Sequence, residues 1–249
     1  MTESWAVDAM YLEGMLSISA AMDANSRPIY ALMVLEKTRE YPILKLIKRA
    51  QAAGIPVEQV SESDIDALAN GNTHGGVIAR VGERHYVALD ALAAGDPAPL
   101  VVMLDGVEDP FNFGQSIRAF YAAGAAGLIV RPRTWHTAAG VVARASAGAS
   151  ELMPTALAET VEAAAEHFRG RGLRIAVADK TRAVSIYDAD LRGGLLLVIG
   201  GERRGVTRSF ADSADLRLAI PYGRAWDQSL GTTAASAILA FEIMRQRKG

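Results

Sequence analysis

The second part of the chain alternates short apolar runs with stretches of helical spacing, and this alternation restricts its fold more than any other feature. Strand-like runs lie at 100–104, 128–130, 174–178, 195–199 and 216–220. Strands that alternate with helices form a mostly parallel sheet with helices on both of its faces. The region is therefore predicted to be an α/β domain.

The segment 229–247 is predicted to be the last helix of the chain. Its apolar residues recur three or four positions apart, and it ends in basic residues that suit the negative end of a helix dipole. Ser229 precedes the first apolar residue and is a suitable N-cap.

The first part of the chain is a smaller α/β module. Its predicted strands lie at 29–35, 55–60 and 76–81, with helices at 41–53 and 63–69. The sequence AAGDPAP, residues 93–99, is typical of a linker. We therefore expect two domains, 1–95 and 98–249.

Composition excludes several classes of protein. The 249 residues include no cysteine, which rules out disulfide-stapled scaffolds and Cys-ligated zinc sites. No run approaches the roughly 18–20 apolar residues that span a bilayer, and the start MTESWAVDAM lacks the basic and apolar regions of a secretory signal. We therefore expect a cytoplasmic protein with no membrane partner.

Charge is unevenly distributed. Residues 1–97 carry 8 basic and 13 acidic side chains, whereas 98–249 carry 18 and 15. A nucleic-acid partner would therefore contact mainly the second part. Candidates for phosphate contacts there are Arg131, Arg133, Arg144, Arg203 and Arg204. Lys45, Lys48 and Arg49 are interpreted as the solvated face of a helix.

Common catalytic motifs are absent from the sequence. It contains no G-x-G-x-x-G after a strand, no G-x-x-x-x-G-K-[ST] and no H-E-x-x-H. Ser146 lacks the first glycine of a nucleophile elbow, because Arg144 stands there. The four histidines show no metal-ligand spacing. We therefore expect neither a dinucleotide fold, a P-loop nor a metal site.

Three clusters lie where predicted strands end. The first is LDGVEDPFNFGQSIR, with Asn112 in the first turn of a helix and Arg118 about two turns later. The second is VIGGERRG, and the third joins Ile220 and Pro221 to SLGTT at 229–233. Ligands of open α/β sheets bind at the carboxyl ends of strands. Taken singly, each cluster also has an ordinary interpretation: an Asn112 N-cap with a solvated Arg118, a tight turn, and a Ser229 N-cap.

Together, in this order, the clusters resemble the three motifs of the SpoU/TrmH-like branch of the SPOUT RNA methyltransferases. RASAGASELMP also resembles the family's stretch between its first two motifs, and the resemblance covers 99–247. Upstream, EGMLSISAAM, GIPVEQVS and NTHGGVIA resemble the substrate-binding domain of many family members, which is similar to ribosomal protein L30e. There the usual Gln of a His-Gln-Gly triplet is Gly75.

The resemblance implies a fold and a function. The expected fold is an L30e-like α/β domain followed by a SPOUT α/β domain, whose parallel sheet ends in a trefoil knot that holds S-adenosylmethionine. The expected reaction methylates a ribose 2'-hydroxyl of ribosomal or transfer RNA, without a metal ion, in a homodimer. Which RNA and which nucleotide cannot be read from the chain.

The resemblance also implies site residues. Asn112, Arg118, Glu202 and Ser229 fall on active-site positions. Gly200, Gly201, Ile220, Pro221 and Leu230 fall on the cofactor-binding positions. We expect Arg118 to polarise the ribose oxygen or hold a phosphate, because a guanidinium is a poor proton acceptor. Glu202, a phosphate oxygen or water then takes the proton, although a role of Arg118 as the base stays open.

Two departures from the family pattern keep other functions open. The motifs commonly have Asn where this chain has Gly201 and Gly231. The alternative to an active enzyme is therefore a catalytically impaired protein that binds RNA or cofactor. Base methylation is a third possibility.

Overall fold

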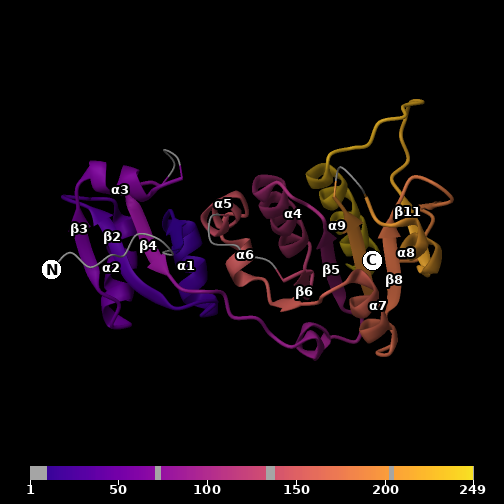
Figure 1. Cartoon of the computed structure of the whole chain (residues 1–249), viewed down its shortest axis with the longest axis horizontal. Helices are drawn as coiled ribbons and strands as arrows, with labels where there is room; N and C mark the ends of the chain where they lie inside the picture. The colour runs from indigo at the N-terminus through magenta and orange to yellow at the C-terminus, as the bar shows by residue number, and fades with distance from the viewer. Residues whose placement is uncertain (1–9, 71–73, 133–137, 202–204, 249) are drawn as a thin grey trace. The chain divides into compact units, whose positions relative to one another are not determined.

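The computed structural model describes residues 10–70, 74–132, 138–201 and 205–248, and the chain forms two compact units (Figure 1). The N-terminal unit comprises Met1–His85 together with Thr134–Leu152. The C-terminal unit comprises Tyr86–Arg133 together with Met153–Gly249.

The N-terminal unit is built on a four-stranded sheet. Its strands are β1 (Met10–Glu13), β4 (Val77–Val81), β2 (Ile29–Leu35) and β3 (Val57–Val60), in that order across the sheet. β4 is antiparallel to both of its neighbours, and β2 is parallel to β3. The helices are α1 (Met15–Ala24), α2 (Tyr41–Ala52) and α3 (Glu62–Leu68). The predicted α/β module is confirmed, whereas β1 and α1 were not predicted.

A segment from the middle of the sequence completes the core of this unit. It contains α5 (Ala139–Ala145) and α6 (Ala149–Leu152), and Ala139 and Ala143 are buried in the cluster around Leu12 and Leu32. A Cβ at Gly140 would lie 2.7 Å from the carbonyl oxygen of Tyr11. Small residues therefore let α5 lie directly against β1.

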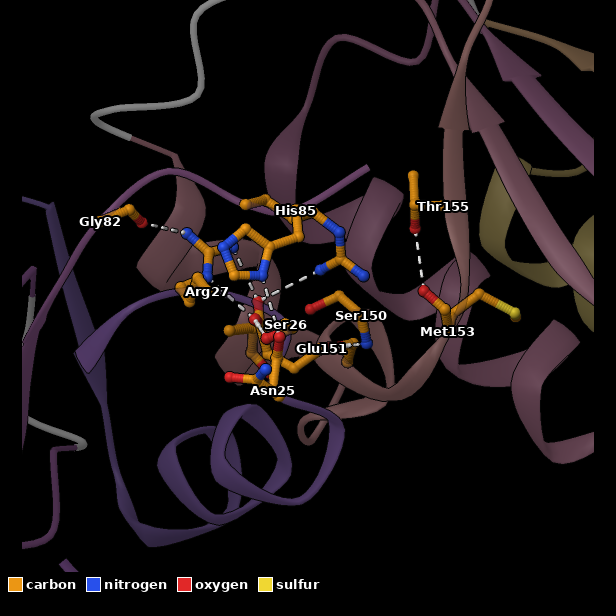
Figure 2. Close-up of polar contacts among 12 residues, drawn as sticks. Asn25, Ser26, Arg27, Gly82, His85, Ser150, Glu151, Met153 and Thr155 are labelled. Carbon is orange, nitrogen blue, oxygen red and sulfur yellow. Dashed lines mark hydrogen bonds and ion pairs between the residues drawn. The ribbon is translucent and has the colours of Figure 1, made fainter. Parts of the chain in front are cut away.

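A buried ion pair also holds this segment. The Arg27 guanidinium donates two hydrogen bonds to the Glu151 carboxylate, at 2.9 and 3.0 Å, and the Ser26 hydroxyl donates a third at 2.5 Å (Figure 2). Arg84 lies 3.6 Å from the same carboxylate. The Arg27 and Glu151 side chains are only 5% and 1% exposed. Burial favours a higher pKa for Glu151, but the two arginines and the hydrogen bonds outweigh it and hold that pKa below its ordinary value.

The C-terminal unit is built on a seven-stranded parallel sheet. Its strand order is β7 (Thr155–Leu157), β6 (Gly127–Val130), β5 (Leu100–Asp105), β10 (Leu195–Gly200), β8 (Arg174–Ala178), β11 (Leu216–Ala219) and β9 (Val184–Ser185). Every pair of neighbouring strands is parallel. This confirms the predicted α/β class and its mostly parallel sheet.

Helices cover both faces of this sheet, which explains the unbroken apolar runs of its central strands. Val101, Met103, Leu196 and Val198 share a buried cluster with Phe168 of α7 (Val161–Arg169). The alternate residues of β5 and β10 point to the opposite face. There α4 (Pro110–Ala122) packs along α9 (Thr232–Lys248), and α9 also contacts β10.

Residues 86–95 pack with the C-terminal unit. Val87 forms a bridge with Ala156, and the short helix η1 (Leu89–Ala93) buries Leu92 in the cluster on β5 and β6. The remaining helix of the C-terminal unit is α8 (Arg208–Ser213). Among the helices in the described ranges, none is long and apolar enough to cross a membrane.

Two predicted helix caps are wrong. α9 begins at Thr232, and the carbonyl of Gly231 accepts its first hydrogen bond from the Ala235 amide, so Ser229 lies before the helix and is not its N-cap. Asp109 caps α4 by accepting a hydrogen bond from the Asn112 amide at 2.7 Å, with Pro110 in the first helical position. The Asn112 side chain is therefore not needed as a cap.

Candidate active site

Segments from all three sequence clusters lie at the carboxyl edge of the parallel sheet. α4 begins a few residues after β5, Gly200 ends β10 and Gly201 follows it, and the segment 220–231 connects β11 to α9. The carboxyl ends of parallel strands meet at one edge of a sheet, where open α/β folds bind their ligands. The sheet therefore gathers the predicted motifs on one side.

Gly201, directly after β10, packs closely against the turn after β5. The Gly201 amide donates to the Asp105 carbonyl at 2.7 Å, and the Gly205 amide donates to the Gly201 carbonyl at 2.8 Å. A Cβ at Gly201 would lie 1.8 Å from the carbonyl oxygen of Gly106. A Cβ at Gly200 would lie 2.3 Å from the carbonyl carbon of Gly205. This edge is thus lined by backbone, and close packing requires glycine at 200 and 201.

The segment between β11 and α9 carries four predicted site residues. Ile220 and Leu230 are half-buried, whereas Pro221 and Ser229 are exposed. The Leu230 amide donates a hydrogen bond of 3.0 Å to the Tyr222 hydroxyl. The two ends of this segment are therefore held close together.

One side-chain contact joins the first and third motifs. The Thr233 hydroxyl, at the start of α9, lies 3.5 Å from both the backbone oxygen and the side-chain oxygen of Asn112 in α4. Both distances are at the long limit of a hydrogen bond. The structure thus brings Asn112 next to the segment that contains Ser229 and Leu230.

Arg118 is not tied to this group. Arg118 is exposed on α4, and six residues of helix place it about 9 Å along the axis from Asn112. Within the described part of the chain, no hydrogen bond or ion pair holds its guanidinium. Glu202 lies outside the described residues, as do Arg203 and Arg204 of the same motif.

The other basic residues proposed for phosphate contacts divide into two groups. Arg131 pairs with Asp105 at 2.6 Å, at the ends of adjacent strands. Arg144, predicted as a phosphate contact of the second domain, lies in the N-terminal unit and pairs with the buried carboxylate of Glu13. Arg133 lies outside the described residues. Lys45 and Lys48 are exposed on α2, as expected for a solvated face.

Sequence reasoning did not assign Tyr222 or Lys180 to the site. Tyr222 holds the Leu230 amide, and the Lys180 ammonium lies 5.7 Å from the centre of the Tyr222 ring. The only sequence signal for Tyr222 is its position directly after Pro221 in the third motif. Lys180 follows β8 and lies outside all three motifs.

No cluster of three or more His, Cys, Asp or Glu residues that could hold a metal ion occurs in the ranges that the structure describes.

Comparisons with known proteins agree on one family. The model of the SpoU rRNA Methylase family matches residues 99–241, and a model described as RNA 2'-O ribose methyltransferase substrate binding matches residues 11–87. The chain is 29% identical over 238 residues to the 23S rRNA (guanosine-2'-O-)-methyltransferase RlmB of Shewanella oneidensis, covering 94% of this chain and 96% of that protein.

Two crystal structures are similar over nearly the whole chain. One is an AdoMet-bound rRNA methyltransferase from Sinorhizobium meliloti, with a TM-score of 0.80, 25% identity and coverage of 96% of this chain and 87% of that one. The other is the SpoU methyltransferase AviRb from Streptomyces viridochromogenes, with a TM-score of 0.80, 22% identity and coverage of 97% and 90%.

Proposed function

Because the chain belongs to the SpoU rRNA methylase family, we propose that it transfers a methyl group from S-adenosylmethionine to a ribose 2'-hydroxyl of RNA. The observation that carries the proposal is the gathering of all three motifs at the carboxyl edge of one parallel sheet. An S-adenosylmethionine-bound relative with the same fold supports the choice of cofactor.

The cofactor is proposed to bind at this edge. Gly200 and Gly201 carry no side chains, and the contacts of their backbone leave no room for any. Gly200, Gly201, Ile220, Pro221 and Leu230 would hold the adenine and methionine parts, largely through backbone groups. When bound, the cofactor supplies a methyl group on a positively charged sulfur.

The side chains then position and activate the RNA. We assign the active-site roles to Asn112, Arg118, Glu202 and Ser229. The Arg118 guanidinium stays protonated, so it stabilises negative charge on the ribose oxygen or grips the neighbouring phosphate. Glu202, a phosphate oxygen or water accepts the hydroxyl proton. Attack on the methyl group requires the ribose oxygen to be held in line at close range.

Gly201 and Gly231, which stand where the family commonly has Asn, differ in the space around them. At Gly201 the packing against Gly106 excludes any side chain. At Gly231 no atom lies within 4 Å of a built Cβ, so an asparagine has room there. The Thr233 hydroxyl, beside Asn112, is placed to supply a hydrogen bond that an asparagine at 231 would otherwise make.

The RNA is proposed to be ribosomal or transfer RNA, since the matching relatives include a methyltransferase of 23S ribosomal RNA. We propose that the region 1–95 holds an L30e-like substrate-binding domain, which α5 and α6 complete, and that 98–249 holds the methyltransferase domain, with which 86–95 pack. The match of a substrate-binding model to residues 11–87 supports the first assignment. Action on these RNAs is consistent with a cytoplasmic location and requires neither membrane nor metal.

The C-terminal part of the sheet is proposed to form a trefoil knot. The parallel strand order and the tight interlock of the turns after β5 and β10 are compatible with the threading that the knot requires.

Calorimetry tests the cofactor assignment. We predict saturable binding of S-adenosylmethionine at micromolar concentration, unchanged by EDTA, because the site is lined by backbone and uses no metal ligand. Folded protein that gives a flat titration up to millimolar S-adenosylmethionine would contradict the assignment. A loss of binding in EDTA would contradict only the metal-free site.

A homodimer is proposed through α4 and α9, where Phe111, Tyr121 and Phe241 are about half-exposed. Burying exposed aromatic side chains at an interface is favourable. Sedimentation at micromolar concentration is expected to give a species of twice the 26.4 kDa chain mass. A single 26.4 kDa species across that range would rule out the dimer.

A further inference from the structure

The segment between β11 and α9 carries a half-buried Tyr222 and an exposed Trp226 beside the candidate active site. Figure 1 shows this segment as a long gold loop that extends away from the sheet of the C-terminal unit. The ring centres of Tyr222 and Trp226 are 5.6 Å apart, with an angle of 45° between the rings. Trp226 is 53% exposed. Much of its indole surface is therefore available to a ligand.

The pair is held in place by polar contacts. The Tyr222 hydroxyl accepts a hydrogen bond from the Leu230 amide at 3.0 Å. The Lys180 ammonium donates to the Asp227 carbonyl at 3.0 Å and lies near the face of the Tyr222 ring. These contacts tie both ends of the loop to each other and to the turn after β8. An aromatic surface fixed in this way binds a flat ligand at a lower entropic cost than a free loop would.

Cations occur in the loop that carries the aromatic pair and in the loop after β8. Lys180, Arg182 and Arg224 are exposed in the two neighbouring loops. Asp227 is exposed as well, but Asp179 is half-buried and its carboxylate accepts hydrogen bonds from the Lys180 and Thr181 amides. This carboxylate is directed to backbone amides, and the Lys180 ammonium keeps its positive charge while it donates to the Asp227 carbonyl.

We infer that Tyr222 and Trp226 form a stacking platform for an unpaired nucleobase of the RNA, close to the nucleotide that is methylated. Proteins bind single-stranded RNA by stacking bases on aromatic side chains while cations hold the backbone, which is the combination found here. The connection from Tyr222 to Leu230 places the platform next to the proposed cofactor site. The inference rests on the proposed function, from which it takes RNA as the ligand.

Binding of an unmodified 23S ribosomal RNA transcript tests the platform. Trp226→Ala is expected to weaken RNA binding about 5- to 150-fold, the loss of one base stack, with S-adenosylmethionine binding unchanged. Trp226→Phe keeps an aromatic face and should recover most of the affinity. The matched control is Tyr187→Ala, which removes another aromatic that is 56% exposed and lies outside the loop.

Fluorescence supplies a second measurement. Trp5→Phe/Trp135→Phe leaves Trp226 as the one remaining tryptophan of the chain, and a stacked base should quench it. The platform would be overturned if Trp226→Ala bound RNA with the affinity of the natural protein. It would also be overturned if the fluorescence of Trp226 did not change when RNA binds. A changed sedimentation of Trp226→Ala would instead assign Trp226 to an interface between protein chains and would also overturn it. Trp226-dependent RNA binding without methyl transfer would leave the platform standing and remove the proposed reaction.

Discussion

Glu151→Ala is expected to destabilise the N-terminal unit by about 3–5 kcal/mol, because it leaves the buried Arg27 without a counter-charge. Arg27 is 5% exposed and makes two hydrogen bonds to this carboxylate. The loss should appear as a lower urea midpoint and as faster amide exchange in β2, α1 and α6, measured by mass spectrometry on the full chain. Local exchange is needed because a chain of two units need not unfold in one step.

The matched control is Asp23→Ala, in the same unit. It breaks the Asp23–Arg49 pair, whose side chains are 55% and 36% exposed, and such pairs contribute about 1 kcal/mol or less. The double variant Arg27→Met/Glu151→Leu removes both charges and should recover much of the stability. Equal effects of Glu151→Ala and Asp23→Ala would show that the buried pair does not hold α6 in place.

The same pair gives the N-terminal unit a pH dependence. The pKa of Glu151 is lowered on folding, so its contribution is complete above the ordinary value of 4.5 and is lost as the pH falls through the lowered value. The natural protein should therefore lose protection of α6 in acid, and the Arg27→Met/Glu151→Leu variant should lose less.

Arg118→Ala is expected to lower kcat/KM for methyl transfer about 10²–10³-fold, the cost of removing one group that stabilises developing negative charge. Affinity for S-adenosylmethionine should stay unchanged, because Arg118 is not assigned to the cofactor. Arg118→Lys keeps the charge but loses the planar pair of donors, and it should recover only part of the rate.

A second arginine serves as the control. Arg192 has a side chain that is 72% exposed and precedes β10, at the opposite edge of the sheet. Arg192→Ala should leave the rate nearly unchanged. Full activity in Arg118→Ala would show that the catalytic assignment from the motif does not apply to this chain, and full activity in Arg118→Lys would contradict a two-donor role.

The sequence predicted the strands of the C-terminal unit well, for a physical reason. β5, β8 and β10 are buried on both faces, so their apolar runs are continuous and their limits are sharp. Short elements were missed: β7 and β9 have only three and two residues, too few to show a period. Helix limits were less accurate, and α9 begins three residues after Ser229 because Gly231 supplies its first carbonyl.

The division of the chain into units was harder to predict. Ala139 and Ala143 complete the core of the N-terminal unit although they lie within the methylase-like region of the sequence. Nothing local marks an alanine-rich helix as a partner of a distant sheet. Likewise, the Glu151–Arg27 pair joins residues 124 positions apart, and no spacing rule relates them.

The candidate site was predicted through motifs, and the structure adds the contacts between them. The order of the motifs suggested one edge of the sheet, which the strand topology supplies. The contact of Thr233 with Asn112 and that of Tyr222 with Leu230 depend on how loops fold back. In the sequence, Gly201 stands where the family commonly has Asn, which suggested the loss of a functional side chain. The structure explains this glycine by its close packing against Gly106.

The nucleoside that the protein modifies decides whether this chain methylates a ribose of RNA. Unmodified ribosomal and transfer RNA would be incubated with the natural protein and S-adenosylmethionine. The RNA would then be digested, and the nucleosides of the digest would be identified by mass spectrometry. We predict a 2'-O-methylated nucleoside that is absent without the protein. Gly231→Asn, which has room in the fold, is the companion variant. Methylation of a base, or ribose methylation by Gly231→Asn but not by the natural protein, would show that this chain is not an RNA ribose methyltransferase.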